Sequence, residues 1–503
     1  MAEIVKVFGP PGTGKTSKLM QLVEAEVKQG TPLKRIGYVS FTKGAAEVIR
    51  ERMHASEEDV KWFRTIHSAC MSLLGIGYDS VLHSGDLRRF REETGLEVRG
   101  DEFDDWDEEK PLDYTPTKRA MELAAATQRD IYDVIREMPP HVNLTRGRVD
   151  LFVDAYTSFK RNIHKFDFTD MLTCYLEDGP SMPVDVLFLD EAQDLSLLQW
   201  LVFHRLARDA KRVYMAGDDD QAIYTFIGGS EYGFLDHEFN NEIMLQKSWR
   251  VPQAVGEAAD QIIHKVGHRK DKAVEWRKDT GDVQRINLDA FTLPWRTYLD
   301  RYKTIMVLCR HRKGARNFSD DLKAVGIPHD INGEGMGSWR EARIIHTYYT
   351  LREGGHVTVK QALKLLDELE LSGAALKGLK PRTRIDAALL KSVDFKAPTW
   401  VQMFAGHDSL KIKRYEAIRQ LVNNDGYGCL AKDPPIKVST MHGAKGAEAE
   451  LVIIVPECTG IVRRNILTPS EIRLAYVALT RTKKQAVVLI PRSDSYITHF
   501  FGG

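Results

Sequence analysis

The sequence lacks a net charge, closely spaced cysteines and a long apolar run. It has 71 Lys and Arg against 71 Asp and Glu, so bulk charge does not indicate a nucleic-acid binder, and any such role must rest on local sites. The 5 cysteines are far apart, which excludes a CxxC metal motif and favours a reducing compartment. No window of about 18 uninterrupted apolar residues is present, which argues against a membrane span.

The remaining composition is that of a soluble globular protein. Hydrophobic residues make up 43% of the chain and charged residues 28%, which excludes long disorder, collagen-like repeats and a disulfide scaffold. At about 100–200 residues per domain, the length of 503 residues predicts two to four domains. The first eight residues indicate a buried strand rather than a signal peptide, so a cytoplasmic location is expected.

A glycine-rich loop follows that first expected strand and precedes an expected helix. Its sequence is Gly9-Pro10-Pro11-Gly12-Thr13-Gly14-Lys15-Thr16, and the helical pattern begins at Ser17. Glycines let successive backbone N–H groups turn toward one anion, and the helix N-terminus adds partial positive charge. We therefore predict a nucleotide site in which Lys15 reaches the β- and γ-phosphates and Thr16 is a ligand of Mg²⁺. The alternative, a strand-to-helix turn without a nucleotide, is disfavoured by the Lys-Thr pair.

Polar side chains follow two further expected strands, over residues 184–189 and 211–216. After the first, Asp190 can hold Mg²⁺ through water, and Glu191 lies where a base can orient and deprotonate the attacking water. Paired acids in this position can also be helix caps, an alternative that the phosphate loop makes remote. After the second strand, the amide of Gln221 can hydrogen-bond both the γ-phosphate and the attacking water. Phe226 offers an apolar face for a base.

The order of these motifs resembles the UvrD/Rep/PcrA-like superfamily 1 helicases. Further matching segments run through both halves of the chain: 40–52 (motif Ia), 65–68 (Ib), 165–172, 245–250 (IV), 305–341, 438–448 (V) and 471–481 (VI). The resemblance implies an α/β fold with two RecA-like P-loop motor domains on parallel sheets, each carrying a mostly helical insertion. It divides the chain into motor domain 1A (1–77 and 151–244), insertion 1B (78–150), motor domain 2A (245–353 and 434–503) and a short insertion 2B (354–433).

The resemblance also assigns roles to residues of this sequence. It implies a catalytic set in which Arg250 and Arg481 are arginine fingers, facing the phosphate loop from the other motor domain. The full expected catalytic set is Lys15, Thr16, Asp190, Glu191, Gln221, Arg250 and Arg481. The nucleotide is expected to contact Gly9, Pro10, Pro11, Gly12, Thr13, Gly14, Lys15, Thr16, Ser17, Trp249, Lys445, Gly446 and Glu448. DNA is expected to contact Phe41, Thr42, Thr65, His67, Phe226, Thr440 and His442.

The function implied by the resemblance is that of an ATP-dependent DNA helicase with Mg²⁺ as cofactor. Such an enzyme would translocate on single-stranded DNA in the 3′→5′ direction and unwind duplex junctions, in a process such as repair or replication. Two alternatives remain: a single-strand translocase that unwinds weakly, and a nucleic-acid-sensing NTPase subunit of a larger complex. RNA is less expected than DNA as the substrate, and no membrane partner is expected. A protein loading partner is possible, and the sequence does not identify it.

Three departures from the family pattern affect these expectations. The phosphate loop begins at Gly9, so the family's N-terminal segment, with a glutamine that reads adenine, is expected to be absent. The family has an arginine at each of two positions that are Ser17 and Ile227 in this sequence. Relaxed base selectivity and a weaker link between the DNA and ATP sites follow as expectations.

Overall fold

The computed structural model describes most of the chain and groups it into two compact units. The described residues are 2–40, 54–98, 114–138, 144–279, 281–287, 289–325, 327–331, 340–369, 371–391, 393, 418, 434–458, 462 and 467–490. The first unit comprises residues 1–280 and 466–480, and the second comprises residues 281–465 and 481–503.

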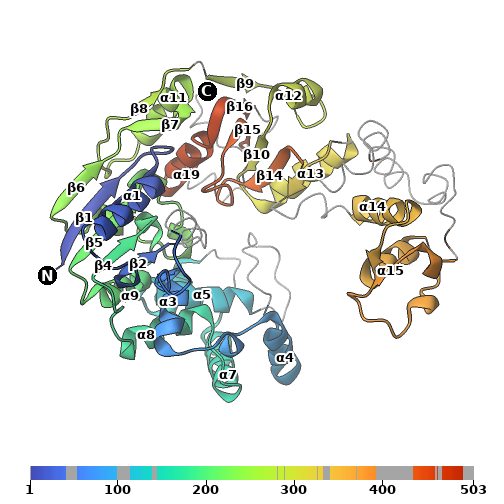
Figure 1. Cartoon of the computed structure of the whole chain (residues 1–503), viewed down its shortest axis with the longest axis horizontal. Coiled ribbons are helices and arrows are strands. Elements are labelled where there is room, and N and C mark those ends of the chain that lie inside the picture. Colours follow the sequence, from blue (N-terminus) through green and yellow to red (C-terminus); the bar gives the residue numbers. More distant parts are fainter. Residues whose placement is uncertain are drawn as a thin grey trace. The chain divides into compact units, whose positions relative to one another are not determined.

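A six-stranded parallel sheet forms the centre of the first unit. Its strand order is β3-β2-β4-β5-β1-β6, so β1 lies between β5 and β6 (Figure 1). The strands are β1 (Glu3–Phe8), β2 (Ile36–Val39), β3 (Phe63–Arg64), β4 (Val186–Leu189), β5 (Arg212–Gly217) and β6 (Asn241–Met244). Every residue of β2 and β4 is buried, as expected for central strands of a parallel sheet with both faces covered.

This strand order determines where the functional loops meet. The strands β4, β5 and β1 are neighbours, and all pairs among them are parallel. The chain segments that leave the carboxyl ends of these strands therefore lie beside one another at the same sheet edge, where open α/β sheets bind their ligands. These segments begin at Gly9, Asp190 and Asp218.

Helices cover this sheet and form the region expected as insertion 1B. They are α1 (Lys15–Lys28), α3 (Ile66–Leu74), α4 (Ser84–Thr94), α5 (Thr115–Thr127), α6 (Ile131–Glu137), α7 (Arg146–Asn162), α8 (Phe168–Asp178), α9 (Leu197–Ala207), α10 (Gly233–Asp236), α11 (Gln253–Ile263) and α19 (Pro469–Leu479). A separate aromatic core, which includes Phe90, Phe152 and Phe159, joins α4 to α7. Two strands, β7 (Lys247–Pro252) and β8 (Glu275–Arg277), pair apart from the main sheet.

The second unit also has a six-stranded parallel sheet. Its order is β11-β14-β10-β15-β16-β9. The strands are β9 (Asp282–Ile286), β10 (Ile305–Cys309), β11 (Asp330–Ile331), β14 (Ile436–Thr440), β15 (Ala449–Val455) and β16 (Thr482–Leu489), and the helices beside them are α12 (Trp295–Arg301) and α13 (Arg312–Ala324). Its core gathers Val307, Ile453 and Val487 from three central strands.

The described part of the expected insertion 2B has its own small core. It contains α15 (Val359–Glu368) and a two-stranded sheet of β12 (Val357–Thr358) and β13 (Arg384–Ile385), next to α14 (Arg340–Arg352). Leu365, Leu366 and Ile385 belong to one buried cluster with residues of α14. Among the described residues, no helix combines the length and the hydropathy that crossing a membrane requires.

The expected fold class, with two parallel α/β sheets, is confirmed. The grouping into units differs from the expected domain borders at two places. Residues 245–280 and α19, which were expected in motor domain 2A, group with the first unit. Contacts of α19 with α11 and with the short 3-10 helix η4 (Asp219–Gln221) account for its place. The division into 1A, 1B, 2A and 2B stays a prediction.

Candidate nucleotide site

The loop after β1 has the backbone of a phosphate-binding loop. Gly12 and Gly14 have positive φ angles of 75° and 82°, which side-chain-bearing residues rarely adopt. Gly14 is the N-cap of α1, and Lys15 and Thr16 open the helix. The ammonium of Lys15 donates a 2.7 Å hydrogen bond to the carbonyl of Gly9, and Thr13 donates one of 2.8 Å to Pro10. The loop thus curls around the lysine, as a phosphate cradle requires.

A hydroxyl and a carboxylate meet where a metal ligand pair was expected. Thr16 Oγ1 donates a 2.9 Å hydrogen bond to Asp190 Oδ2, across 174 residues of chain. The buried hydroxyl of Tyr38 donates to the same oxygen at 2.9 Å. Burial and the neighbouring Glu191 carboxylate raise the pKa of Asp190. Hard oxygen ligands of this kind fit Mg²⁺, which binds proteins through one or two carboxylates plus phosphates of the substrate.

Glu191 has an unusual backbone conformation. Its φ and ψ are 55° and 41°, in the left-handed region that costs an L-residue roughly 1–2 kcal/mol. Strain of this kind gathers at functional sites, where the surrounding structure maintains it. Oε2 of Glu191 accepts a 2.7 Å hydrogen bond from the amide of Gln193. Both the backbone and the side chain of Glu191, the expected base, are therefore constrained.

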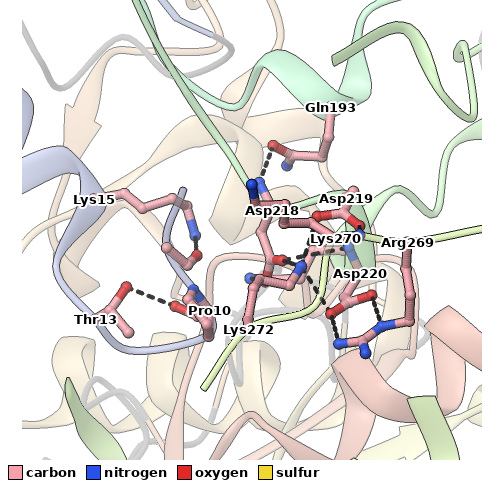
Figure 2. A network of polar contacts seen from close by, with 12 residues as sticks. Pro10, Thr13, Lys15, Gln193, Asp218, Asp219, Asp220, Arg269, Lys270 and Lys272 are labelled. Atoms are coloured by element: carbon pink, nitrogen blue, oxygen red, sulfur yellow. Dashed lines mark hydrogen bonds and ion pairs between the residues drawn. The ribbon is translucent and has the colours of Figure 1, made fainter. Parts of the chain in front are cut away.

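The turn after β5 is almost wholly buried. Its residues Asp218, Asp219 and Asp220 have exposed fractions of 0%, 1% and 1%, and Gln221 has one of 5%. Figure 2 shows these three carboxylates around the side chains of Lys272 and Arg269. Gln221 Nε2 donates a 2.6 Å hydrogen bond to Asp218 Oδ2. The expected γ-phosphate sensor is thus attached to a rigid, ion-paired turn at the same sheet edge as the phosphate loop.

The strand β7 lies directly against the phosphate loop. The N–H of Trp249 donates a 2.9 Å hydrogen bond to the carbonyl of Gly12, and Ser248 Oγ donates one of 2.8 Å to Pro11. A Cβ at Gly12 would come within 2.5 Å of Cβ of Arg250, so only glycine allows this approach. We expected Arg250 in the second motor domain, but it lies in the first unit, beside the loop that it was expected to face.

Trp249 is available for stacking with a base. Its side chain is 65% exposed although its backbone is bonded to the loop. The ammonium of Lys247 lies 4.0 Å from the centroid of the indole ring. An exposed indole beside a phosphate loop is where a nucleotide base can stack.

The other expected nucleotide contacts lie in the second unit. Arg481 is 2% exposed and stands immediately before β16, and its carbonyl accepts a hydrogen bond from the N–H of Ala449. Lys445 and Gly446 follow β14 in a turn, and Glu448 forms an ion pair with Lys483. Because these residues belong to the second unit, their role toward a nucleotide held by the first unit stays a prediction.

The residues that were expected to contact DNA differ in their exposure and in their structural roles. Phe226 is 48% exposed in a short 3-10 helix (Thr225–Ile227), so it is not a core residue. Thr65 caps α3 by accepting from the N–H of Ser68, a structural role that does not prevent a DNA contact. Burial lowers the pKa of His67 to about 4, which leaves this residue neutral at pH 7. Phe41 and Thr42 lie outside the described residues.

Two expected DNA contacts follow β14 in the second unit. Thr440 ends the strand, and its Oγ1 accepts a 3.1 Å hydrogen bond from the N–H of Gly443. Burial, with smaller contributions from Arg310 and Lys445, lowers the pKa of His442 to about 3. His442 is therefore a neutral hydrogen-bonding group at pH 7 and not a cation.

Several residues that stabilise the site were not predicted from the sequence. Tyr38 lies in β2 and gave no signal, because a buried strand tyrosine has no motif. Gln193 lies two residues after Glu191, in the segment that follows β4, and no role was predicted for it. Arg269 and Lys272, which pair with the turn after β5, lie far downstream in a segment without any recognised pattern.

Comparisons with known proteins agree with this geometry. The family model described as the UvrD/REP helicase N-terminal domain matches residues 1–240, and the UvrD-like helicase C-terminal domain matches residues 405–492. The ATP-dependent DNA helicase PcrA of Staphylococcus aureus is 22% identical over 315 residues, which are 57% of this chain and 41% of that protein. YjcD of Bacillus subtilis is 24% identical over 413 residues, 74% of this chain and 53% of that protein. PcrA of Bacillus subtilis is 23% identical over 264 residues, 48% of this chain and 35% of that protein.

The matched regions therefore span about half the length of these relatives, or less. The first family model includes the loops after β1, β4 and β5, and the second includes β14, β15 and β16. On these grounds the chain belongs to the UvrD/REP family of superfamily 1 helicases.

Proposed function

We propose that this chain hydrolyses ATP and uses the cycle to move along single-stranded DNA and to unwind duplexes. The observation that carries the proposal is the meeting of the Lys15 loop, the Thr16–Asp190 pair and Glu191 at the ends of neighbouring parallel strands. This arrangement provides a phosphate cradle, a metal ligand pair and a base within one sheet edge. The printed names of the PcrA relatives, DNA helicases dependent on ATP, support the same activity.

In this proposal, residues of the first unit have separate roles in phosphoryl transfer. Lys15 holds the β- and γ-phosphates, Glu191 accepts a proton from the attacking water, and Gln221 orients that water against the γ-phosphate. Mg²⁺, held by Thr16 and Asp190, would supply charge neutralisation for the phosphate oxygens when bound. Burial of Asp190 and Gln221 excludes bulk water, so each of these polar groups acts in a medium of low dielectric constant.

Two arginines complete the proposed charge stabilisation. Arg250 lies beside Gly12, close to where the phosphates would lie. Arg481 belongs to the second unit, so its approach to the γ-phosphate would depend on closure of the two units around ATP. An arginine that stabilises the transferred phosphoryl group is worth about 10³–10⁵ in rate in related NTPases. Hydrolysis would release this contact, and the resulting opening would move the strand.

DNA binding in this proposal relies on stacking and backbone contacts. Phe226 supplies an exposed ring for a base, and Thr440 and His442 contact the backbone. The basic loop Lys377, Lys380, Arg382 and Arg384, whose side chains are exposed, would contact duplex phosphates at a fork. The 3′→5′ direction is proposed from the family resemblance of the segment that contains Gln221 and Phe226 (motif III) and of residues 245–250 (motif IV). The proposal includes a cytoplasmic location, because the PcrA and YjcD relatives come from bacteria, where DNA lies in the cytoplasm.

A single assay tests the proposal and separates it from the two alternatives. ATPase activity is measured with and without single-stranded DNA, and unwinding is measured on duplexes with a 3′ or a 5′ tail and on an RNA control. We expect DNA to stimulate hydrolysis and the 3′-tailed duplex to open. Hydrolysis and protein displacement without unwinding would favour the translocase, whereas nucleotide binding without movement would favour the sensor.

K15A is the control variant for this assay. Loss of the ammonium should abolish turnover, because Lys15 lies in the phosphate loop, where its ammonium bonds to the carbonyl of Gly9. It should spare single-strand binding, because none of the residues expected to contact DNA belongs to that loop. Turnover that is unchanged in K15A would contradict the proposed site. Equal turnover of ATP and GTP would support the expected relaxed base selectivity.

A further inference from the structure

The amide of Gln193 connects the segment after β4 with the segment after β5. Its Nε2 donates a 2.7 Å hydrogen bond to Oε2 of Glu191 and a longer one of 3.3 Å to Oδ2 of Asp194, and its Oε1 accepts a 3.0 Å hydrogen bond from the N–H of Asp218. An amide oxygen only accepts and an amide nitrogen only donates, so these partners fix the orientation of the side chain. Gln193 is 2% exposed, which leaves its hydrogen bonds protected from water.

The backbone leaves space for this bridge at one position. A Cβ at Gly217 would lie 2.8 Å from Gln193 Oε1 and 2.9 Å from the ring of Phe234. Glycine as the last residue of β5 therefore allows the amide to reach the N–H of Asp218. The end of β5 and the side chain of Gln193 are therefore complementary in shape.

Asp218 forms hydrogen bonds with three residues of this network. Besides its N–H bond to Gln193, its Oδ2 accepts the 2.6 Å hydrogen bond from Gln221 Nε2. Its Oδ1 accepts a 2.7 Å hydrogen bond from Lys272 Nζ. One fully buried residue thus joins the group that holds Glu191 to the group expected to contact the γ-phosphate.

Lys272 fixes the turn that contains Asp218. Its ammonium lies 2.7 Å from Asp218 Oδ1, 2.6 Å from Asp219 Oδ1 and 2.8 Å from Asp220 Oδ2, and its side chain is 1% exposed. Arg269 forms a two-pronged pair with Asp220, at 2.9 and 2.7 Å. The N–H of Lys270 donates to Asp219 Oδ2 at 2.8 Å (Figure 2).

Burial and ion pairing have opposite effects on the pKa values of this cluster. Burial alone would raise the pKa of Asp218, but the ammonium of Lys272, with that of Lys15, holds it below the usual value. Burial disfavours the charged form of Lys272, yet the three carboxylates keep its pKa above the usual value. Each charge is therefore maintained by its partners, and a charge-assisted bond fixes the turn more firmly than a neutral one.

We propose that Gln193 and Asp218, clamped by Lys272, are positioning residues that set the geometry of Glu191 and Gln221 for hydrolysis. This role rests on the proposed ATPase function. A shift of Gln221 against a γ-phosphate would pass through Asp218 and Gln193 to the carboxylate of Glu191, because each link is a direct hydrogen bond. The contact of Gln221 with the phosphate would thereby be coupled to the orientation of the base.

The first test compares the wild type with Q193M, which keeps the side-chain length and removes the amide's hydrogen bonds to Glu191, Asp194 and Asp218. We expect kcat for ATP to fall about 10- to 100-fold, as for other groups that orient a catalytic residue. Binding of a fluorescent ATP analogue should change by less than about threefold, because the hydrogen bonds of Gln193 run to Glu191, Asp194 and Asp218, in the segments after β4 and β5. A Q193M variant with wild-type kcat, or one with equal losses in kcat and affinity, would overturn the proposal.

A second test asks whether Gln193 acts through Glu191. In single-turnover reactions, E191Q alone should strongly reduce the hydrolysis rate, and adding Q193M to E191Q should cost less than about twofold more. A residue that served only to pack the site would instead reduce both backgrounds by the same factor. Additive losses would therefore assign Gln193 a structural role and reject positioning.

A third test uses two buried lysines that hold aspartates. Lys160 lies 2.6 Å from both Asp167 and Asp170 with a side chain 8% exposed, but it belongs to α7 and not to the nucleotide site. K272M and K160M should both lower the melting temperature. Below both transitions, K272M should lower kcat about tenfold or more, whereas K160M should leave it unchanged. Equal kcat values in the two variants would overturn the clamp.

These outcomes are distinguishable from failure of the proposed function. A wild type with no ATPase in the presence of DNA would reject the function and this role together. A wild type that hydrolyses ATP and loses turnover in K15A, but tolerates Q193M and K272M, would reject the positioning role alone.

Discussion

The hydroxyl of Tyr38 and the carboxylate of Asp190 are hydrogen-bonded at 2.9 Å, on the oxygen that also accepts from Thr16. Tyr38 is fully buried in β2, and burial together with the two nearby carboxylates raises its pKa, so it remains a donor at any physiological pH. The expected metal ligand therefore has one oxygen fixed by two hydroxyl groups from different elements. Asp190 needs this support, because burial disfavours its charged form.

Y38F tests the importance of that hydroxyl. Removing it leaves a buried carboxylate with one donor fewer, which should lower the free energy of unfolding by about 1–3 kcal/mol. Half-maximal ATPase should also require more Mg²⁺, because Asp190 is less well oriented. Urea denaturation and a Mg²⁺ titration measure the two effects.

Y214F is the matched control for this prediction. Tyr214 donates a 2.8 Å hydrogen bond to Glu26, another buried carboxylate, but that pair lies away from the carboxyl ends of the strands. The Y214F variant should be less stable than the wild type, with no change in the Mg²⁺ requirement. A shift of the requirement in both variants would contradict a local effect on Asp190.

The left-handed backbone of Glu191 predicts a conflict between stability and activity. E191A and E191G both remove the carboxylate and should both abolish hydrolysis. Only glycine relieves the φ of 55°, so E191G should be more stable than E191A by about 1 kcal/mol. Thermal denaturation of the two variants gives the difference directly, and a more stable E191A would mean that the conformation is not strained.

Much of this site could be predicted because its signals are local in sequence. The phosphate loop, Asp190, Glu191 and Gln221 each follow an apolar run that indicates a strand, and all three strands formed as expected. Parallel strands place such segments at one edge, so their meeting follows from the fold class. The class itself was confirmed for both sheets.

The supporting contacts could not be predicted, because they depend on tertiary structure. Lys272 and Asp218 are 54 residues apart, and no periodicity or spacing connects them. Tyr38 reaches Asp190 only because β2 and β4 are neighbours in a strand order that the sequence does not state. The position of Arg250 depended on where residues 245–280 pack, which a motif comparison does not determine.

Phe226 provides a prediction for DNA binding. Its side chain is 48% exposed, so F226A should leave the melting temperature within about 1 °C of the wild type. Loss of a stacked base costs about 1–3 kcal/mol, which corresponds to about 5- to 150-fold in the Kd for single-stranded DNA. Fluorescence anisotropy with a labelled oligonucleotide measures it. F291A, which removes another exposed ring, 55% exposed, is the control, and equal losses in both would exclude a specific stacking site.

His329 predicts how stability changes with pH. It is fully buried, its Nε2 lies 2.7 Å from Ser319 Oγ, and burial lowers its pKa to about 4. Between pH 6.5 and 4 the unfolded chain binds a proton at this residue that the folded chain does not bind. Stability is therefore lost as the pH falls through this window, by about 1.4 kcal/mol per pH unit for one such group.

H329Q removes this titration and should make the second unit less sensitive to acid. The difference in melting temperature between wild type and H329Q should favour the wild type at pH 7.5 and shrink steadily from pH 6.5 to pH 5, because only the wild type loses stability through this group. A wild-type advantage that stays constant from pH 7.5 to pH 5 would mean that the folded chain binds a proton at His329 as readily as the unfolded chain, which the burial of His329 against Ser319 and the carbonyl of Ile327 opposes.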